Sequence, residues 1–131
     1  MTVLYISMTE VVEYHRSIFA DEGQPQVPMI APEKLESALL RPSAEAFGTE
    51  AYPSLAEKAA VLLQGIVIAH PFLDGNKRAG LAAMLLFLEM NGVEPYTDRE
   101  ALYDFVIAVT TGELREVEDI AARVRELFAL E

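Results

Sequence analysis

The chain contains no cysteine, and only two of its 131 residues are histidine. Without thiols it can form no disulfide scaffold, no thiolate zinc site and no cysteine nucleophile. Two histidines are too few for a transition-metal site built from protein ligands alone. Glycine and proline number only seven each and 52% of the residues are hydrophobic, so the composition excludes an intrinsically disordered chain.

Basic residues are also scarce. Ten lysines and arginines face 21 aspartates and glutamates, which gives a formal net charge of −11. Such a charge repels phosphate backbones, so the composition argues against direct binding of nucleic acid. One pair of adjacent basic residues, Lys77 and Arg78, stands out against this acidic background.

Long apolar runs are missing as well. The longest charge-free apolar stretches span residues 59–69 and 79–88, and both are too short to cross a bilayer. The first six residues lack the basic start of a signal peptide. We therefore expect a soluble cytoplasmic protein with no membrane partner.

The length predicts a single domain over residues 1–131. Apolar residues recur at helical spacing between proline, glycine and capping residues, which predicts an all-α fold of about six helices. A short β-like segment, 3–6, opens the chain, and loops are expected over 24–30 and 41–52. The expected helices cover residues 8–22, 33–40, 54–70, 77–90, 98–110 and 117–130.

Local patterns refine these helices. Ser7 with Glu10, and Thr97 with Glu100, have the spacing of capping boxes that begin a helix. His15 lies on the apolar stripe of the first helix, which is typical of a histidine packed in the core. The helix over 54–70 is apolar all round at its centre, so it should be buried.

The junction over residues 70–78 breaks this pattern. Lys77 and Arg78 begin a helix, where the partial positive charge of the helix dipole disfavours cations. An anion held by free backbone N–H groups and both side chains would explain this placement. Gly75 permits close backbone approach to a ligand, and Asp74 is the kind of oxygen ligand that Mg²⁺ prefers.

His70 adds a side chain that can take a proton at neutral pH, so the junction suits phosphoryl or nucleotidyl transfer. Simpler interpretations remain open from the residues alone. Residues 74–76 have the composition of a tight turn, and a histidine that caps a helix C-terminus fits His70 equally well. Asp74 and Arg78 can also form a purely structural ion pair.

Residues 70–76, His-Pro-Phe-Leu-Asp-Gly-Asn, resemble the His-x-Phe-x-Asp/Glu-Gly/Ala-Asn signature of the Fic/Doc superfamily. Fic adenylyltransferases typically continue with Gly and Arg and then a further Arg, whereas this chain has Lys77, Arg78 and then Leu81. That pattern resembles the Doc branch, the death-on-curing toxins. The segments 35–39, 57–60 and 87–92 agree with the same branch, and the resemblance implies a compact helical bundle.

The resemblance implies ATP-dependent transfer of a phosphoryl group to a hydroxyl of elongation factor Tu, which arrests translation. His70 would be the general base and Asp74 would help to hold Mg²⁺. Gly75, Asn76, Lys77 and Arg78 would bind phosphates. Pro71 would stiffen the loop, and Phe72 would anchor it in the core. Residues 41–53 lie where the family has a target-docking flap, although an ordinary exposed loop fits them equally well.

The resemblance also implies a regulator. Many Fic proteins carry an inhibitory Ser/Thr-x-x-x-Glu-Gly/Asn motif, and the nearest match here, Ser17 to Glu22, is one residue too long. Inhibition is then expected from a second chain, a Phd-like antitoxin whose disordered tail folds on the toxin. Fic-type AMP transfer is the alternative reaction, and a non-catalytic module that binds a nucleotide or partner is the alternative class.

Overall fold

A computed structural model describes residues 2–23 and 27–131, so the predicted loop over 24–30 is described only from Val27 onward. The described part contains six helices within two residues of the expected bounds, which confirms the all-α class. None of them is long and apolar enough to cross a bilayer. The helices are α1 (Met8–Asp21), α2 (Pro32–Leu40), α3 (Leu55–Ala69), α4 (Asn76–Met90), α5 (Arg99–Thr111) and α6 (Val117–Phe128).

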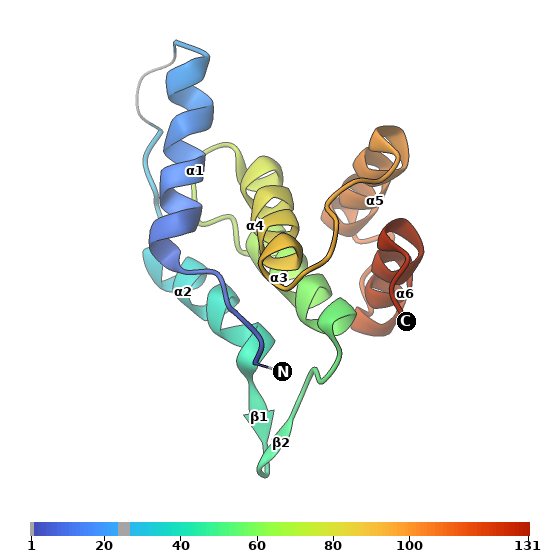
Figure 1. Ribbon diagram of the computed structural model, residues 1–131. Helices are drawn as coiled ribbons and strands as arrows, with labels where there is room; N and C mark the ends of the chain where they lie inside the picture. The colour runs from blue at the N-terminus through green and yellow to red at the C-terminus, as the bar shows by residue number, and fades with distance from the viewer. Residues whose placement is uncertain (1, 24–26) are drawn as a thin grey trace.

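Helix α3 forms the centre of the bundle (Figure 1). It packs against α2, α4, α5 and α6, so its surface is covered from several sides. Residues 59–63 are fully buried, as the apolar centre of this helix predicts. Helix α1 lies against α4 and α2, and α6 packs against α3 and α5.

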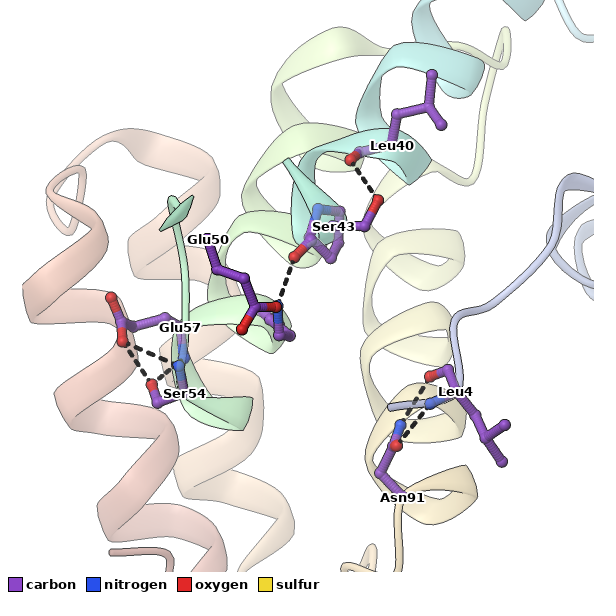
Figure 2. Close-up of polar contacts among 9 residues, drawn as sticks. Leu4, Leu40, Ser43, Glu50, Ser54, Glu57 and Asn91 are labelled. Atoms are coloured by element: carbon purple, nitrogen blue, oxygen red, sulfur yellow. Dashed lines mark hydrogen bonds and ion pairs between the residues drawn. The ribbon is translucent and has the colours of Figure 1, made fainter. Parts of the chain in front are cut away.

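Side-chain caps fix where several helices begin. The predicted box of Ser7 and Glu10 is confirmed at α1. A second box, Ser54 with Glu57, begins α3 and was not recognised in the sequence (Figure 2). The predicted box of Thr97 and Glu100 is wrong, because the neighbouring Asp98 caps α5 by accepting a hydrogen bond from the backbone of Ala101 at 2.9 Å.

The β-like segment expected over residues 3–6 is not a strand, because the described part of the chain places no second strand beside it. A side chain takes the place of that strand. The amide of Asn91, just after α4, accepts from the backbone N–H of Leu4 at 2.9 Å and donates to its carbonyl at 2.8 Å (Figure 2). The segment is therefore extended and attached to the end of α4.

The connection over 41–52 is more regular than expected. It contains a 3₁₀ turn, η1 (Arg41–Ser43), and an antiparallel hairpin of β1 (Glu45–Ala46) and β2 (Thr49–Glu50), which projects from the bundle (Figure 1). The two-residue turn at Phe47 and Gly48 has positive φ at both positions, 55° and 79°. Such a turn matches the natural twist of a hairpin. The connection is exposed over the hairpin, as expected, and the hairpin itself was not recognised in the sequence.

Lys58 holds this hairpin to the bundle. Its side chain is 1% exposed, and its ammonium group donates to the Pro42 carbonyl at 2.9 Å and to the Glu50 carboxylate at 2.8 Å (Figure 2). The ammonium group also lies 5.6 Å from the centre of the Tyr5 ring. Burial alone would lower the pKa of Lys58, but the hydrogen bond and negative charge of the Glu50 carboxylate, with the nearby Tyr5 side chain, raise this pKa above its ordinary value.

We predict that Lys58→Met lowers the free energy of unfolding by about 1–3 kcal/mol, because it removes both bonds of a buried ammonium group. A raised native-state pKa stabilises the fold below the unfolded-state pKa, and this stabilisation is lost as the pH rises through the native value. The difference in the free energy of unfolding between wild type and Lys58→Met should therefore shrink above about pH 10.5. Urea titrations at several pH values measure this free energy. Lys34→Met, at an exposed lysine, is the control. Equal losses of stability in both variants would contradict the prediction.

Candidate active site

The loop between α3 and α4, residues 70–75, together with Asn76, is called the motif loop below. His70 follows the last residue of α3, and its φ of +50° lies in the left-handed region. Helix α4 begins after Gly75, which has a φ of +83°. Left-handed backbone at a non-glycine residue carries strain and occurs preferentially at functional sites. The two left-handed residues turn the chain sharply between two buried helices.

The segment before α2 holds the motif loop from one side. The carbonyl of Pro71 accepts from the backbone N–H groups of Ile30 at 2.8 Å and Ala31 at 3.0 Å. The N–H of Leu73 donates to the Pro28 carbonyl at 3.1 Å. This short ladder fixes the path of the loop, and the sequence contained no local signal for it.

Helix α1 holds the motif loop from another side. Phe72 is 2% exposed, as expected of a core anchor, and its ring stacks on that of His15 with the centroids 3.6 Å apart. His15 is buried, as predicted, but it does more than fill space. Its Nε2 lies 2.8 Å from the carbonyl oxygen of Asp74, so the ring donates a hydrogen bond to the loop. Sequence reasoning missed this role, because the partner lies 59 residues away.

Gly75 is required because it has no side chain as well as because its φ is positive. A Cβ atom at this position would lie 2.9 Å from the Phe19 ring and 3.2 Å from Nε2 of His15. Real Cβ atoms essentially never approach a neighbour within 3.0 Å. The close approach of the loop to α1 therefore depends on the absence of a side chain here.

The Asn76 side chain binds the loop that precedes it. Its Oδ1 accepts from the Phe72 N–H at 3.0 Å, and its Nδ2 donates to the Phe72 carbonyl at 2.9 Å. These two bonds orient the amide so that Nδ2 also faces Nδ1 of His70, at 3.3 Å. A neutral His70 ring that accepts this contact has its lone pair on Nδ1 and its proton on Nε2.

No side chain caps the N-terminus of α4. The first N–H groups of a helix have no partner within the helix, and the dipole adds partial positive charge there. Lys77 and Arg78 occupy this first turn, and both are exposed. The geometry therefore concentrates positive charge and free donors in one place, as an anion-binding site requires.

Arg78 is paired, but not with the predicted partner. Its guanidinium donates to the carboxylate of Glu22 at 3.0 Å and lies 5.4 Å from the centre of the Phe19 ring. The alternative of an Asp74–Arg78 ion pair is therefore wrong, because Asp74 lies on the loop whereas Glu22, at the end of α1, reaches the guanidinium. Both side chains of this pair are about half exposed, so a competing anion has access to Arg78.

Asp74 is exposed, and its Oδ1 accepts from the backbone N–H of Gly75 at 2.7 Å. Within residues 2–23 and 27–131, no three histidine or acidic side chains gather closely enough to hold a metal ion by themselves. Asp74 thus fits an Mg²⁺ ion that receives most of its ligands from phosphates and water, which is the usual form of nucleotide-bound Mg²⁺.

These groups share one pocket of about 480 Å³, a volume typical of small-molecule sites. It contains every predicted chemical group of the site, together with Leu73 and Thr110, which the sequence analysis did not identify. Thr110 comes from α5, so the wall includes a helix beyond the motif. The lining residues are His70, Leu73, Asp74, Gly75, Asn76, Lys77, Arg78 and Thr110. Pro71 and Phe72 are buried behind the pocket.

A proton acceptor, a carboxylate and a positively charged helix start facing one pocket are the groups needed to bind phosphates and activate a hydroxyl. This motif on these helices defines the chain as a member of the Fic/DOC family, whose model matches residues 5–88. The match covers α1 to α4 and confirms the resemblance in the motif loop.

Two curated relatives place the chain near the Doc branch. It is 47% identical over 64 residues to Toxin Doc of Mycolicibacterium smegmatis, a match that covers 49% of each chain. It is 37% identical over 79 residues to Protein kinase doc of Escherichia phage P1, which covers 60% of this chain and 61% of the phage protein. The chain thus spans about half to three fifths of the relatives it matches.

We predict that Gly75→Ala lowers the free energy of unfolding by about 1–3 kcal/mol through backbone strain and contact with α1. Gly92→Ala is the matched control, since Gly92 has a φ of +86° but no atom within 4 Å of a built Cβ. Denaturant unfolding should show a larger loss for Gly75→Ala than for Gly92→Ala. Equal losses would mean that the approach to Phe19 and His15 contributes nothing.

We also predict that Glu22→Gln strengthens binding of Mg·ATP by about two- to fivefold, because the variant frees Arg78 from a half-exposed ion pair. Lys77→Glu should have the opposite effect, with a melting temperature near that of wild type. Isothermal titration calorimetry measures both. As a control, Glu13→Gln removes the same charge within α1, from an ion pair with Arg16. An equal gain in that variant would refute the local explanation.

Proposed function

We propose that the chain is a Doc-type toxin that transfers the γ-phosphoryl group of ATP to a hydroxyl of a target protein. The observation that carries this proposal is the single pocket in which His70 faces the uncapped start of α4 with Lys77 and Arg78. Membership of the Fic/DOC family and the printed name of the phage relative support the same reaction class.

In this proposal the start of α4 binds the phosphates. The backbone N–H groups of the first turn point toward the pocket end of the helix, and Lys77 and Arg78 add two full charges. Asn76 contributes by shaping the loop, since its side chain is already bonded to the backbone of Phe72. Phosphate binding would draw Arg78 away from Glu22.

His70 takes the proton of the target hydroxyl in this proposal. Its side chain is exposed on the pocket wall, so a target can approach it. Asn76 orients the ring through Nδ1, at 3.3 Å. Proton uptake at Nε2 requires the other tautomer, so the contact with Asn76 is released or exchanged when the target binds. Mg²⁺ bound with ATP and held by Asp74 would neutralise charge on the phosphates.

The residue after Asn76 favours phosphoryl over AMP transfer. Lys77 stands where Fic adenylyltransferases typically have glycine. A glycine lets the backbone wrap closely around the α- and β-phosphates, whereas a lysine side chain fills that space and adds a point charge. We infer that the nucleotide lies with its γ-phosphoryl group toward His70, and AMP transfer is the alternative outcome at the same pocket.

Elongation factor Tu is the target implied by the Doc resemblance, and the β1–β2 hairpin suits its docking. Both strands are exposed, and within the described part of the chain they pair with each other. A free strand edge can align an extended peptide by strand addition. We further propose a Phd-like antitoxin as the regulator, with a disordered tail that folds on this chain.

The proposal is tested by incubating purified protein with elongation factor Tu and ATP labelled at either the α- or the γ-phosphate. We expect γ-label on the target. His70→Ala should slow labelling by about 10²-fold or more, the usual contribution of a general base. Calorimetry on His70→Ala should still detect ATP binding, which separates lost chemistry from lost affinity.

The other outcomes discriminate between the alternatives. An α-label on the target would replace the kinase by an adenylyltransferase. No label with wild type, or equal label with wild type and His70→Ala, would overturn the catalytic proposal and leave a non-catalytic binding module.

A further inference from the structure

A hollow of about 550 Å³ lies between α2 and α3 and is called the α2–α3 hollow below. One of its walls belongs to α3, the helix that is buried over most of its length. Gly65, Ile68 and Ala69 line this wall, at the i, i+3 and i+4 positions of one helix face. Ile68 is 58% exposed. The central helix thus leaves one apolar stripe uncovered, and this stripe ends beside His70.

Arg41, in η1, brings a positive charge to this hollow. Its guanidinium donates to Oε1 of Gln64 at 3.3 Å and to the Tyr52 hydroxyl at 3.5 Å, and it lies 5.9 Å from the centre of the Tyr52 ring. Gln64 is itself 8% exposed and donates to the Arg115 carbonyl at 2.7 Å. The guanidinium is therefore held in position by neutral groups.

No carboxylate neutralises this guanidinium. The ion pairs found in residues 2–23 and 27–131 involve other basic side chains. Lys34, exposed on α2, adds a second positive charge to the lining, and Glu33 is the one acidic residue there. A guanidinium has five N–H donors, and the two contacts to neutral groups leave donors of Arg41 free. A carboxylate from another molecule would complete this arrangement.

We propose that the α2–α3 hollow binds an aspartate or glutamate side chain of the target protein, close in sequence to the hydroxyl that receives the phosphoryl group. Arginine matches the planar geometry of a carboxylate, and recognition of acidic motifs by arginine is a recurring mode of peptide binding. A segment aligned on the hairpin would cross the hollow toward His70, because the hairpin precedes the start of α3 and the motif loop follows its end (Figure 1).

Helix α3 sets the expected spacing. Gln64, which holds Arg41, precedes His70 by six residues. A helix rises about 1.5 Å per residue, so these two residues lie about 9 Å apart along the axis. An extended peptide advances about 3.3 Å per residue, so the acidic residue should lie about three positions from the acceptor serine or threonine. This spacing rests on the proposed function, which places the acceptor at His70, whereas the carboxylate site itself does not.

The probes are dye-labelled peptides of about ten residues, each with one serine and an aspartate three positions before or after it. A matched set carries asparagine in place of aspartate, which has a similar shape without the charge. Fluorescence anisotropy without nucleotide should give at least one aspartate peptide an affinity at least about fivefold higher than its asparagine counterpart. This difference should shrink with added salt.

Matched variants separate the hollow from other basic residues. Arg41→Gln should remove the preference for aspartate, whereas Arg99→Gln, the same change at an exposed position of α5, should alter the affinity less than about twofold. Arg41→Glu should reverse the preference toward a peptide with lysine at that position, which a purely structural role of Arg41 would not produce.

A second position tests the apolar stripe. Ile68→Glu places a negative charge in the hollow at an exposed site, so it should weaken binding of the aspartate peptide at least about fivefold. Its melting temperature should stay near that of wild type, because the side chain is not buried.

Four results would overturn the proposal. These are no preference for aspartate over asparagine, equal weakening by Arg41→Gln and Arg99→Gln, an unchanged preference in Arg41→Glu, and unchanged binding to a folded Ile68→Glu variant. A parallel assay measures transfer of γ-label to elongation factor Tu. Label transfer without a charge preference would overturn this inference alone, whereas a charge preference without transfer would contradict the proposed function and leave the carboxylate site standing.

Discussion

The side-chain amide of Asn76 is the interaction on which the site depends. Asn76 is the first residue of α4, and both of its amide atoms bind the backbone of Phe72, four residues earlier. These bonds close the loop, and the N-cap position before Asn76 is Gly75, which has no side chain to cap the helix. The first N–H groups of α4 therefore keep their partial positive charge at the mouth of the closed loop.

This arrangement accounts for the one basic pair in an acidic chain. A net charge of −11 opposes extended polyanions, since repulsion accumulates along their length. One small anion at the start of α4 would experience mainly the local field, because interactions between exposed charges more than about 8 Å apart are largely screened at physiological salt. Glu22 limits even this local field by pairing with Arg78 at 3.0 Å. The protein thus pairs the guanidinium at this helix start with a carboxylate of its own.

The sequence predicted what depends on neighbours along the chain. Helix positions follow from periodicity and caps, and the motif loop was identified from the order of its residues. The contacts that hold this loop come from distant segments. His15 was recognised as buried, but its bond to Asp74 depends on how α1 packs. Lys58 has the sequence character of an exposed lysine, yet η1 and the hairpin bury it. Likewise, only the fold brings Glu22 to Arg78 and Thr110 to the wall of the pocket.

Helices α1 and α4 set the geometry of the motif loop together. On the α1 side, His15 bonds to the Asp74 carbonyl, and Phe19 lies within 2.9 Å of a Cβ built at Gly75. On the α4 side, Arg78 pairs with Glu22, which directly follows α1. Because these contacts all cross from α1 to the loop or to α4, a change in the spacing of the two helices would alter the bond to Asp74 and the pairing of Arg78 together. The position of the loop and the charge at the start of α4 therefore depend on the same helix packing.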